Sequence, residues 1–102
     1  MTYRVRFTEE AQADLLRLYA FILERDATDW QLAERALEAI RAGMHLLEQN
    51  PFTCRKTGTD SPFLRELVIP FGAAGYVALF EIENTETVTV LAVRHQRESD
   101  YH

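Results

Sequence analysis

Residues 63–101 read FLRELVIPFGAAGYVALFEIENTETVTVLAVRHQRESDY and decide the fold, because they hold three apolar runs separated by two short breaks. β-Branched and aromatic side chains dominate the runs, so we predict strands over 63–69, 76–83 and 88–95. Such short breaks allow only tight reversals, which makes the three strands an antiparallel meander. The last run is apolar on both faces and is therefore expected inside the sheet, with a neighbour on each side.

The first break, residues 70–75, reads PFGAAG and is predicted to be a turn. Gly72 and Gly75 can adopt the positive φ angles that turns require. This break is not a phosphate-binding loop, because it lacks the lysine and hydroxyl of that motif and has a strand on both sides. The second break, residues 84–86, reads NTE and is predicted to be the other hairpin turn.

The first half of the chain supplies one further strand and two helices. Residues 2–7 alternate apolar and polar side chains, which is the period of a strand. Thr8 occupies an N-cap position, and the apolar positions that follow predict a helix over 8–25: Ala11, Leu15, Leu18 and Ile22, widened by Leu16, Tyr19 and Leu23. A second helix is predicted over 29–49, and Pro51 ends it because the residue before a proline avoids helical angles.

The predicted fold class is therefore α+β with the order β-α-α-β-β-β. A helical hairpin packs on one face of a four-stranded antiparallel sheet, and the other face is partly open. Because residues 88–95 need two neighbours, we pair them with residues 2–7. Counting chain reversals through two helices and three strands makes this pairing antiparallel. The length of 102 residues predicts a single domain over 1–102.

Composition narrows the class of protein. The chain is 47% hydrophobic and 26% charged, as globular proteins are. No apolar run approaches the roughly 20 residues of a membrane helix, and the N-terminus lacks the apolar block of a signal peptide. We therefore expect a cytoplasmic protein without membrane association. The net charge of −5 disfavours binding of nucleic acid through its phosphates.

The loop at residues 51–62 reads PFTCRKTGTDSP and carries the cationic pair Arg55 and Lys56. The pair is either solvated on a connector or forms a cationic lip beside a groove. Cys54 is the single cysteine, so an internal disulfide is excluded. It has no cysteine or histidine partner at metal-ligand spacing, which predicts an inert thiol that is buried or half-buried. We expect no metal and no cofactor.

Several pieces of the sequence together carry a resemblance to a known family: LREL at 64–67, PFGAAGY at 70–76, VLAVRHQRE at 90–98 and Tyr101, in a chain of this order and length. The chain resembles the ParE/RelE superfamily of toxins from bacterial toxin–antitoxin pairs, also called plasmid-stabilisation proteins. The superfamily has two activities on one fold, so the fold alone does not decide between them. RelE-like members cut mRNA in the ribosome, whereas ParE-like members block DNA gyrase. The resemblance implies that a cognate antitoxin, ParD-like in the ParE case, silences the toxin with its C-terminal segment. Whether the toxin forms oligomers with its antitoxin stays open.

Two positions favour the ParE-like activity. RelE-like enzymes have an arginine after the Gly-Tyr that opens the middle meander strand, where this chain has Val77. They have another arginine six residues before the terminal tyrosine, where this chain has His95. Removing one donor that stabilises charge in a transition state costs about a hundredfold or more in rate. We therefore favour a non-catalytic gyrase inhibitor. The alternatives are a ribosome-dependent mRNA endonuclease and an inactive binding module.

The candidate site residues lie at the end of the last strand. In the ParE-like interpretation Arg94, His95, Arg97 and Tyr101 form a target-binding surface. In the RelE-like interpretation the catalytic residues are Arg65, His95, Arg97 and Tyr101. His95 would then be the general base, and Tyr101 is either an acid or a ring packed on the sheet. Arg65 has the alternative of a salt bridge with a neighbouring glutamate. We expect the antitoxin's amphipathic tail on the open sheet face.

Overall fold

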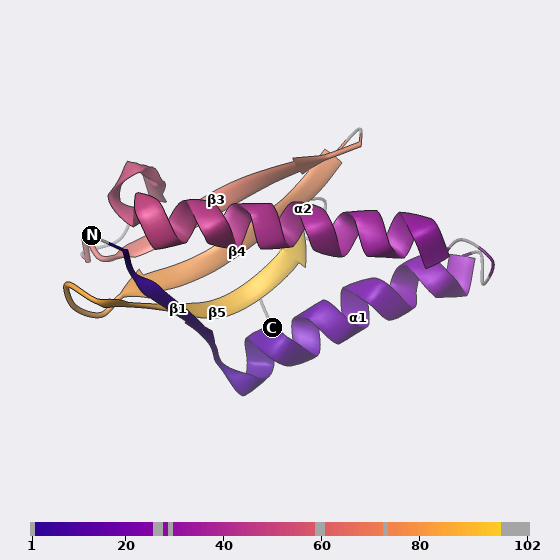
Figure 1. The fold of residues 1–102 in the computed structure, drawn as a ribbon, viewed down its shortest axis with the longest axis horizontal. Helices are drawn as coiled ribbons and strands as arrows, with labels where there is room; N and C mark the ends of the chain where they lie inside the picture. The colour runs from indigo at the N-terminus through magenta and orange to yellow at the C-terminus, as the bar shows by residue number, and fades with distance from the viewer. Residues whose placement is uncertain (1, 26–27, 29, 59–60, 73, 97–102) are drawn as a thin grey trace.

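Two helices lie against one face of a twisted sheet in the computed structural model, which describes residues 2–25, 28, 30–58, 61–72 and 74–96 (Figure 1). Its elements, in chain order, are β1 (Arg4–Phe7), α1 (Glu9–Arg25), α2 (Trp30–Gln49), the short 3₁₀ helix η1 (Pro51–Thr53), β2 (Arg55–Lys56), β3 (Leu64–Phe71), β4 (Ala74–Ile82) and β5 (Thr87–His95). The predicted order and the helical hairpin on one sheet face are confirmed. The predicted positive φ angles are confirmed, at 62° for Gly72 and 141° for Gly75. The turn is shorter than the predicted 70–75, because Pro70 pairs with Gly75 and Phe71 with Ala74 within β3 and β4.

The sheet has the strand order β1-β5-β4-β3-β2. The apolar strand β5 has neighbours on both sides, as predicted, and β1 is one of them. The predicted antiparallel direction of that pair is wrong, because β1 runs parallel to β5. Only Thr8 separates β1 from α1, and the chain keeps its direction there instead of reversing (Figure 1). The antiparallel prediction assumed a reversal of the chain between β1 and α1, and that reversal does not occur.

The sheet also has five strands where four were predicted. The additional strand, β2, is the cationic pair Arg55 and Lys56, which pairs with Glu66 and Arg65 of β3. A strand of two residues shows no periodicity, so the sequence pattern gave no signal for it. Part of the predicted loop is thus an edge strand of the sheet.

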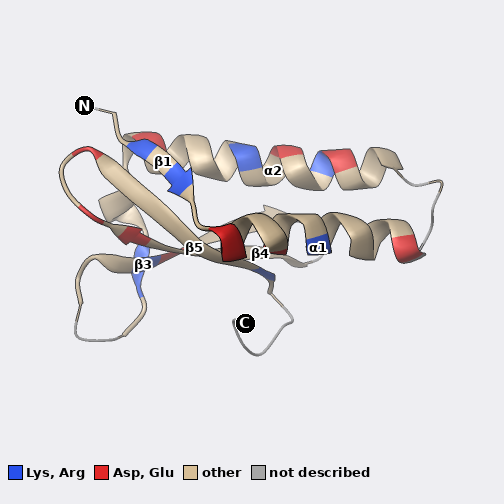
Figure 2. Ribbon diagram, turned by 90° about the horizontal axis from the view of Figure 1, so that it is seen from below, with Lys and Arg blue, Asp and Glu red and all other residues tan. Residues whose placement is uncertain are grey.

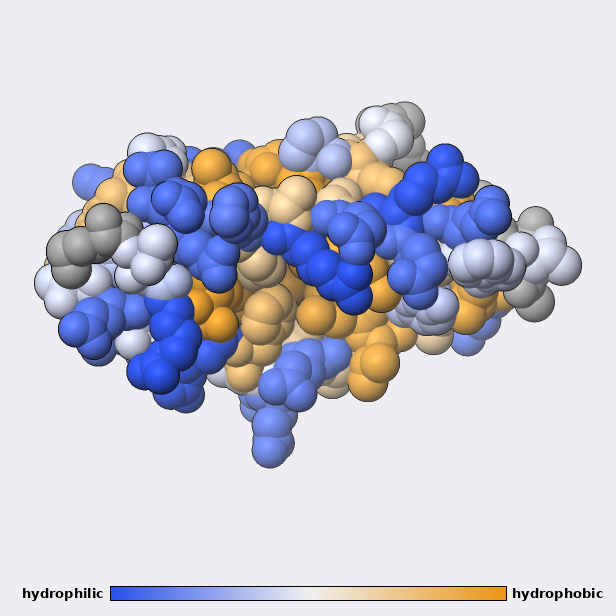
Figure 3. Space-filling view, in the orientation of Figure 1, coloured by the Kyte–Doolittle hydropathy of each residue, from blue (hydrophilic) through white to orange (hydrophobic). Residues whose placement is uncertain are grey.

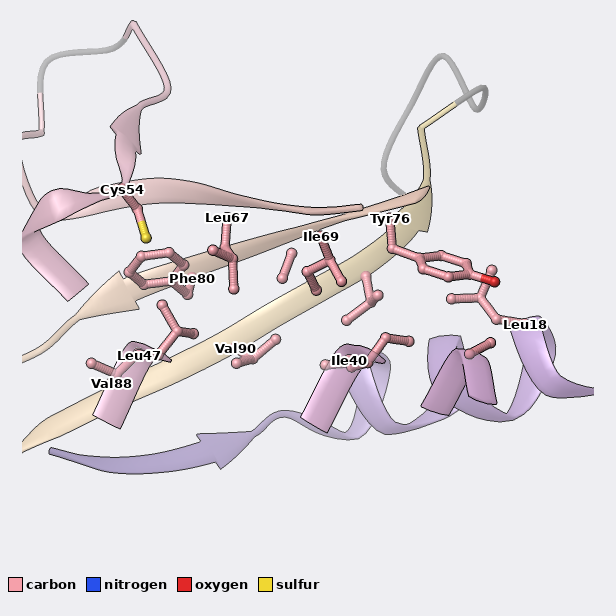
Figure 4. Close-up of a cluster of buried hydrophobic side chains, with 14 of the residues drawn as sticks. Leu18, Ile40, Leu47, Cys54, Leu67, Ile69, Tyr76, Phe80, Val88 and Val90 are labelled. Carbon is pink, nitrogen blue, oxygen red and sulfur yellow. The ribbon is translucent and has the colours of Figure 1, made fainter. Parts of the chain in front are cut away.

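The core lies between the helices and the sheet (Figure 4). Phe80, Val88 and Val90 of the sheet meet Leu47 of α2, and all four side chains are fully buried. At Gly43 the helix α2 approaches β3 closely, because a Cβ there would lie 3.0 Å from side-chain atoms of both Leu67 and Ile69. The two layers are thus packed without room for a larger residue at this point.

Thr8 joins the start of α1 to β5. Its Oγ1 accepts the backbone N–H of Ala11 at 3.1 Å, which confirms the predicted N-cap. The same hydroxyl donates to the carbonyl of Leu91 at 3.3 Å. Beyond the end of β1, the buried carboxylate of Asp14 accepts the backbone N–H of Val93 at 2.9 Å. Helix α1 therefore replaces β1 as the partner along this part of β5.

Candidate functional site

The end of β5 separates two of the predicted target-binding residues. Arg94 lies opposite Val77 on β4, and His95 lies opposite Tyr76. The Tyr76 side chain points into the core near Leu18 of α1 (Figure 4). Because successive side chains of a strand point to opposite faces, His95 lies on the helix side of the sheet and Arg94 on the outer face. The two side chains thus leave the strand on opposite faces of the sheet.

His95 packs its ring against the ring of Tyr76. The two ring centroids are 5.6 Å apart at an interplanar angle of 87°. Burial raises the pKa of the Tyr76 phenol above its ordinary value. The Arg94 guanidinium reaches along the strand end and donates to the carbonyls of His95 and Gln96 at 3.3 and 3.4 Å. Arg97 and Tyr101, the other two predicted residues, lie outside the described residues.

Arg65 is engaged in holding the loop that precedes β3. Its Nε donates to the carbonyl of Pro62 at 2.8 Å, and its Nη1 donates to the carbonyls of Phe52 and Cys54 at 2.8 and 2.9 Å. The guanidinium carbon also lies 5.2 Å from the centroid of the Phe52 ring. The side chain is only 9% exposed. These carbonyl contacts replace the predicted salt bridge, and they leave Arg65 little access to a phosphate.

The cationic pair on β2 is only partly available to a ligand. Arg55 forms a salt bridge with Glu66, with 3.2 Å between Nε and Oε1. Lys56 is exposed beside it. Cys54 is buried as predicted, and its burial raises the pKa of the thiol, while the nearby Arg65 charge opposes that shift. In the part of the chain that the structure describes, no three metal-ligating side chains gather into a group that could hold a metal ion.

A feature that the sequence analysis missed is an apolar groove between the two helices. It has a volume of about 770 Å³ and appears as apolar surface between α1 and α2 (Figure 3). Its lining residues are Phe7, Leu15, Leu16, Tyr19, Glu34, Leu37, Ile40, Arg41, Met44, His45 and Glu48. Leu16 on its rim is 73% exposed. The signal in the sequence was the width of the apolar stripe on the first helix, which exceeds what the sheet can cover.

None of the helices that the structure describes is long and apolar enough to cross a membrane. A family model matches residues 5–100 of this chain, and it describes the ParE toxin of the type II toxin–antitoxin system parDE. The chain belongs to the ParE toxin family. It is also 32% identical over 82 residues to "Toxin RelE1" of Caulobacter vibrioides, a match that covers 80% of this chain and 82% of that relative.

Two solved structures share the fold of this ParE-family chain. One is a chromosomal ParDE toxin–antitoxin system from P. aeruginosa, with a TM-score of 0.71 at 18% identity, covering 92% of this chain and 96% of that one. The other is the toxin–antitoxin complex RelBE2 from Mycobacterium tuberculosis, with a TM-score of 0.60 at 24% identity, covering 93% and 99%. At these identities the likeness shows the fold alone. One neighbour is named as a ParE system and the other as a RelE system, so these names do not identify the target of this toxin. The target has to be inferred from the residues of the chain itself.

Proposed function

We propose that this ParE-family toxin acts without hydrolysis, by inhibiting DNA gyrase, and that a cognate antitoxin neutralises it. The observation that carries the proposal is Val77, whose side chain is 2% exposed on the outer sheet face between Val68 and Arg94. The resemblance to RelE-like enzymes implies that the RNA-cleaving relatives have an arginine at this position. A buried valine offers no charge to a phosphate.

The rest of the expected catalytic set supports the same proposal. Cleavage of RNA develops negative charge on phosphorus, which enzymes stabilise with cations that are free to meet it. Arg65 already donates to three backbone carbonyls, and His95 has its ring against Tyr76. The nearby Arg94 remains on the outer face as a recognition residue. We propose that Arg94, His95, Arg97 and Tyr101 contribute to a protein-binding surface.

One observation favours the second candidate function, a ribosome-dependent mRNA endonuclease. The 32% identity is to a relative whose name places it among RelE toxins. In that case His95, Arg97 and Tyr101 would supply the acid–base chemistry. The two candidates make opposite predictions for purified protein, so one pair of assays separates them.

The test measures supercoiling of relaxed plasmid by purified gyrase, in parallel with cleavage of ribosome-bound mRNA. We expect the toxin to inhibit supercoiling and to leave the mRNA intact. Arg94→Gln is expected to weaken inhibition about tenfold, the cost of one charged contact. Phe21→Ala, an exposed apolar change on α1, serves as the matched control and should leave inhibition unchanged. Cut mRNA with unaffected supercoiling would refute the gyrase proposal, and no effect in either assay would favour the inactive binding module.

We further propose that an amphipathic segment of the antitoxin occupies the groove between α1 and α2, in place of the open sheet face that we first expected. Val77 and Ala92 on the outer sheet face are already buried, whereas Leu16 projects from the rim of the groove. Amphipathic helices bind such grooves through regularly spaced apolar side chains. Leu16→Glu is expected to weaken antitoxin binding at least tenfold, and Val68→Glu on the outer face is expected to have little effect. The reverse pattern would place the antitoxin on the sheet.

A further inference from the structure

A second, smaller hollow lies at the end of the sheet opposite to His95. It has a volume of about 230 Å³ and is lined by Tyr3, Phe52, Phe63, Ile82, Glu83, Asn84 and Thr85. The lining comes from the start of the chain, η1, the residue before β3 and the turn between β4 and β5, which meet at one end of the molecule (Figure 1). None of the residues that line this hollow has a role in the function proposed above.

Three aromatic side chains form the hollow, and two of them are unusually exposed. Phe52 and Phe63 are each 48% exposed, and their rings meet edge to face with centroids 6.3 Å apart. Burying these rings against a partner would remove apolar surface from water. Exposed rings at the wall of a hollow are the usual anchors of a binding site.

A hydrogen bond holds the backbone of each of the three aromatic residues. The Tyr3 N–H donates to the carbonyl of Glu48 at 2.8 Å. The Phe52 carbonyl accepts Nη1 of Arg65 at 2.8 Å. The Phe63 carbonyl accepts the N–H of Ile82 at 2.9 Å. The hollow is thus assembled before any ligand arrives, which reduces the entropy lost on binding.

The charge of the hollow selects the ligand. Glu83 is exposed on its wall, and among the described residues no lysine or arginine lines it. Acidic residues also mark the turn between β4 and β5 (Figure 2), where the Glu86 N–H donates to Oδ1 of Asn84 at 2.8 Å and orders the turn. Aromatic faces attract cations through their quadrupole, and a neighbouring carboxylate adds to this attraction. The Arg65 guanidinium contacts the Phe52 ring but does not line the hollow.

We propose that this hollow binds the side chain of an arginine on a protein partner, with Phe63 and Tyr3 against the guanidinium and Glu83 as its counter-ion. The planar, weakly hydrated guanidinium stacks on aromatic rings and pairs with a carboxylate at the same time. The inference goes beyond the proposed function, because it requires neither gyrase nor an antitoxin as the partner. It defines a second contact surface about the length of β5 away from His95.

The test uses the 102-residue chain and two tripeptides. One is acetyl-Gly-Arg-Gly-amide, and the other is the same peptide with citrulline, which keeps the shape of arginine without its charge. Binding is followed by NMR through the ring resonances of Tyr3, Phe52 and Phe63. We expect the arginine peptide to shift these resonances with a millimolar dissociation constant, and the citrulline peptide to bind at least about threefold more weakly.

Variants distinguish the cation site from a merely apolar hollow. Glu83→Gln and Phe63→Leu are each expected to weaken binding of the arginine peptide about threefold or more. Phe21→Leu changes an exposed ring on α1 outside the hollow and should leave binding unchanged. Urea unfolding of each variant reports whether the fold is retained. Equal binding of the two peptides, or ring resonances that do not move, would overturn the proposal whether or not gyrase is inhibited.

Discussion

Arg65 is predicted to stabilise the fold rather than to act on a substrate, and substitution tests this directly. Arg65→Met removes three hydrogen bonds to carbonyls and the contact with the Phe52 ring. The bond to the Cys54 carbonyl is buried, so its loss costs about 2 kcal/mol, as expected for a charged donor. Water can replace the other two bonds in part, so together with the ring contact they add about 1 kcal/mol. The expected loss is about 3 kcal/mol of unfolding free energy.

The assay is urea unfolding followed by circular dichroism. With a slope of about 1.5 kcal/mol/M for a chain of this size, a loss of about 3 kcal/mol lowers the midpoint by about 2 M. Arg65→Lys keeps the charge but loses the planar fork, and it should fall between the parent and Arg65→Met. Arg55→Met, which breaks an exposed salt bridge, is the matched control and should cost less than about 1 kcal/mol. An unchanged midpoint for Arg65→Met, combined with lost toxicity, would refute the structural role and return Arg65 to the candidate catalysts.

Three further predictions follow from other buried contacts. Asp14→Ala should cost about 1–3 kcal/mol by leaving the N–H of Val93 without its acceptor, and Asp14→Asn should cost less; equal urea midpoints for the two variants would contradict this. Gly75→Ala should lower the free energy of unfolding by more than about 2 kcal/mol, because φ is 141° and the new Cβ would collide with a backbone carbonyl. Gly72→Ala should lower it by about 1 kcal/mol, because φ is 62° but the Cβ would enter open space. Thermal unfolding ranks the two variants. Burial raises the pKa of the Cys54 thiol in the folded state, so the stability that the neutral thiol contributes is present below its ordinary pKa of 9.0 and is lost as the pH rises above that value. Cys54→Ala should therefore flatten the decline of the urea midpoint at alkaline pH. An identical decline in the variant would argue against this role of the thiol.

The meander could be predicted from the sequence because its signals are local. Each strand shows its own apolar period, and Gly72 marks the turn between two of them. The direction of β1 could not be read in the same way, since it depends on whether the chain turns at Thr8. A single residue between a strand and a helix allows either path, and the observed path is the one in which Thr8 donates a hydrogen bond to the carbonyl of Leu91.

The site residues were harder to predict, because their roles depend on contacts between distant segments. Arg65 was expected to meet a carboxylate, but its partners are backbone carbonyls, which carry no signature in the sequence. His95 and Arg94 are adjacent in the chain, and adjacency suggested one cluster. The strand places them on opposite faces instead, because successive side chains alternate. The alternation of side chains along a strand is visible in the sequence, and it already places these two residues on opposite faces.

The parallel pairing of β1 with β5 has a consequence for how the toxin is made. The first strand can pair only after the last one has been made, and the hydrogen bonds that join the start of α1 to β5 span 83 residues at Thr8 and 79 at Asp14. Such distant contacts cannot form while the chain is still being synthesised from its N-terminus. The sheet of this toxin therefore cannot be completed until β5, the strand between β1 and β4, has left the ribosomal exit tunnel. The cell thus has an interval in which an antitoxin already present can meet the toxin at the moment it folds.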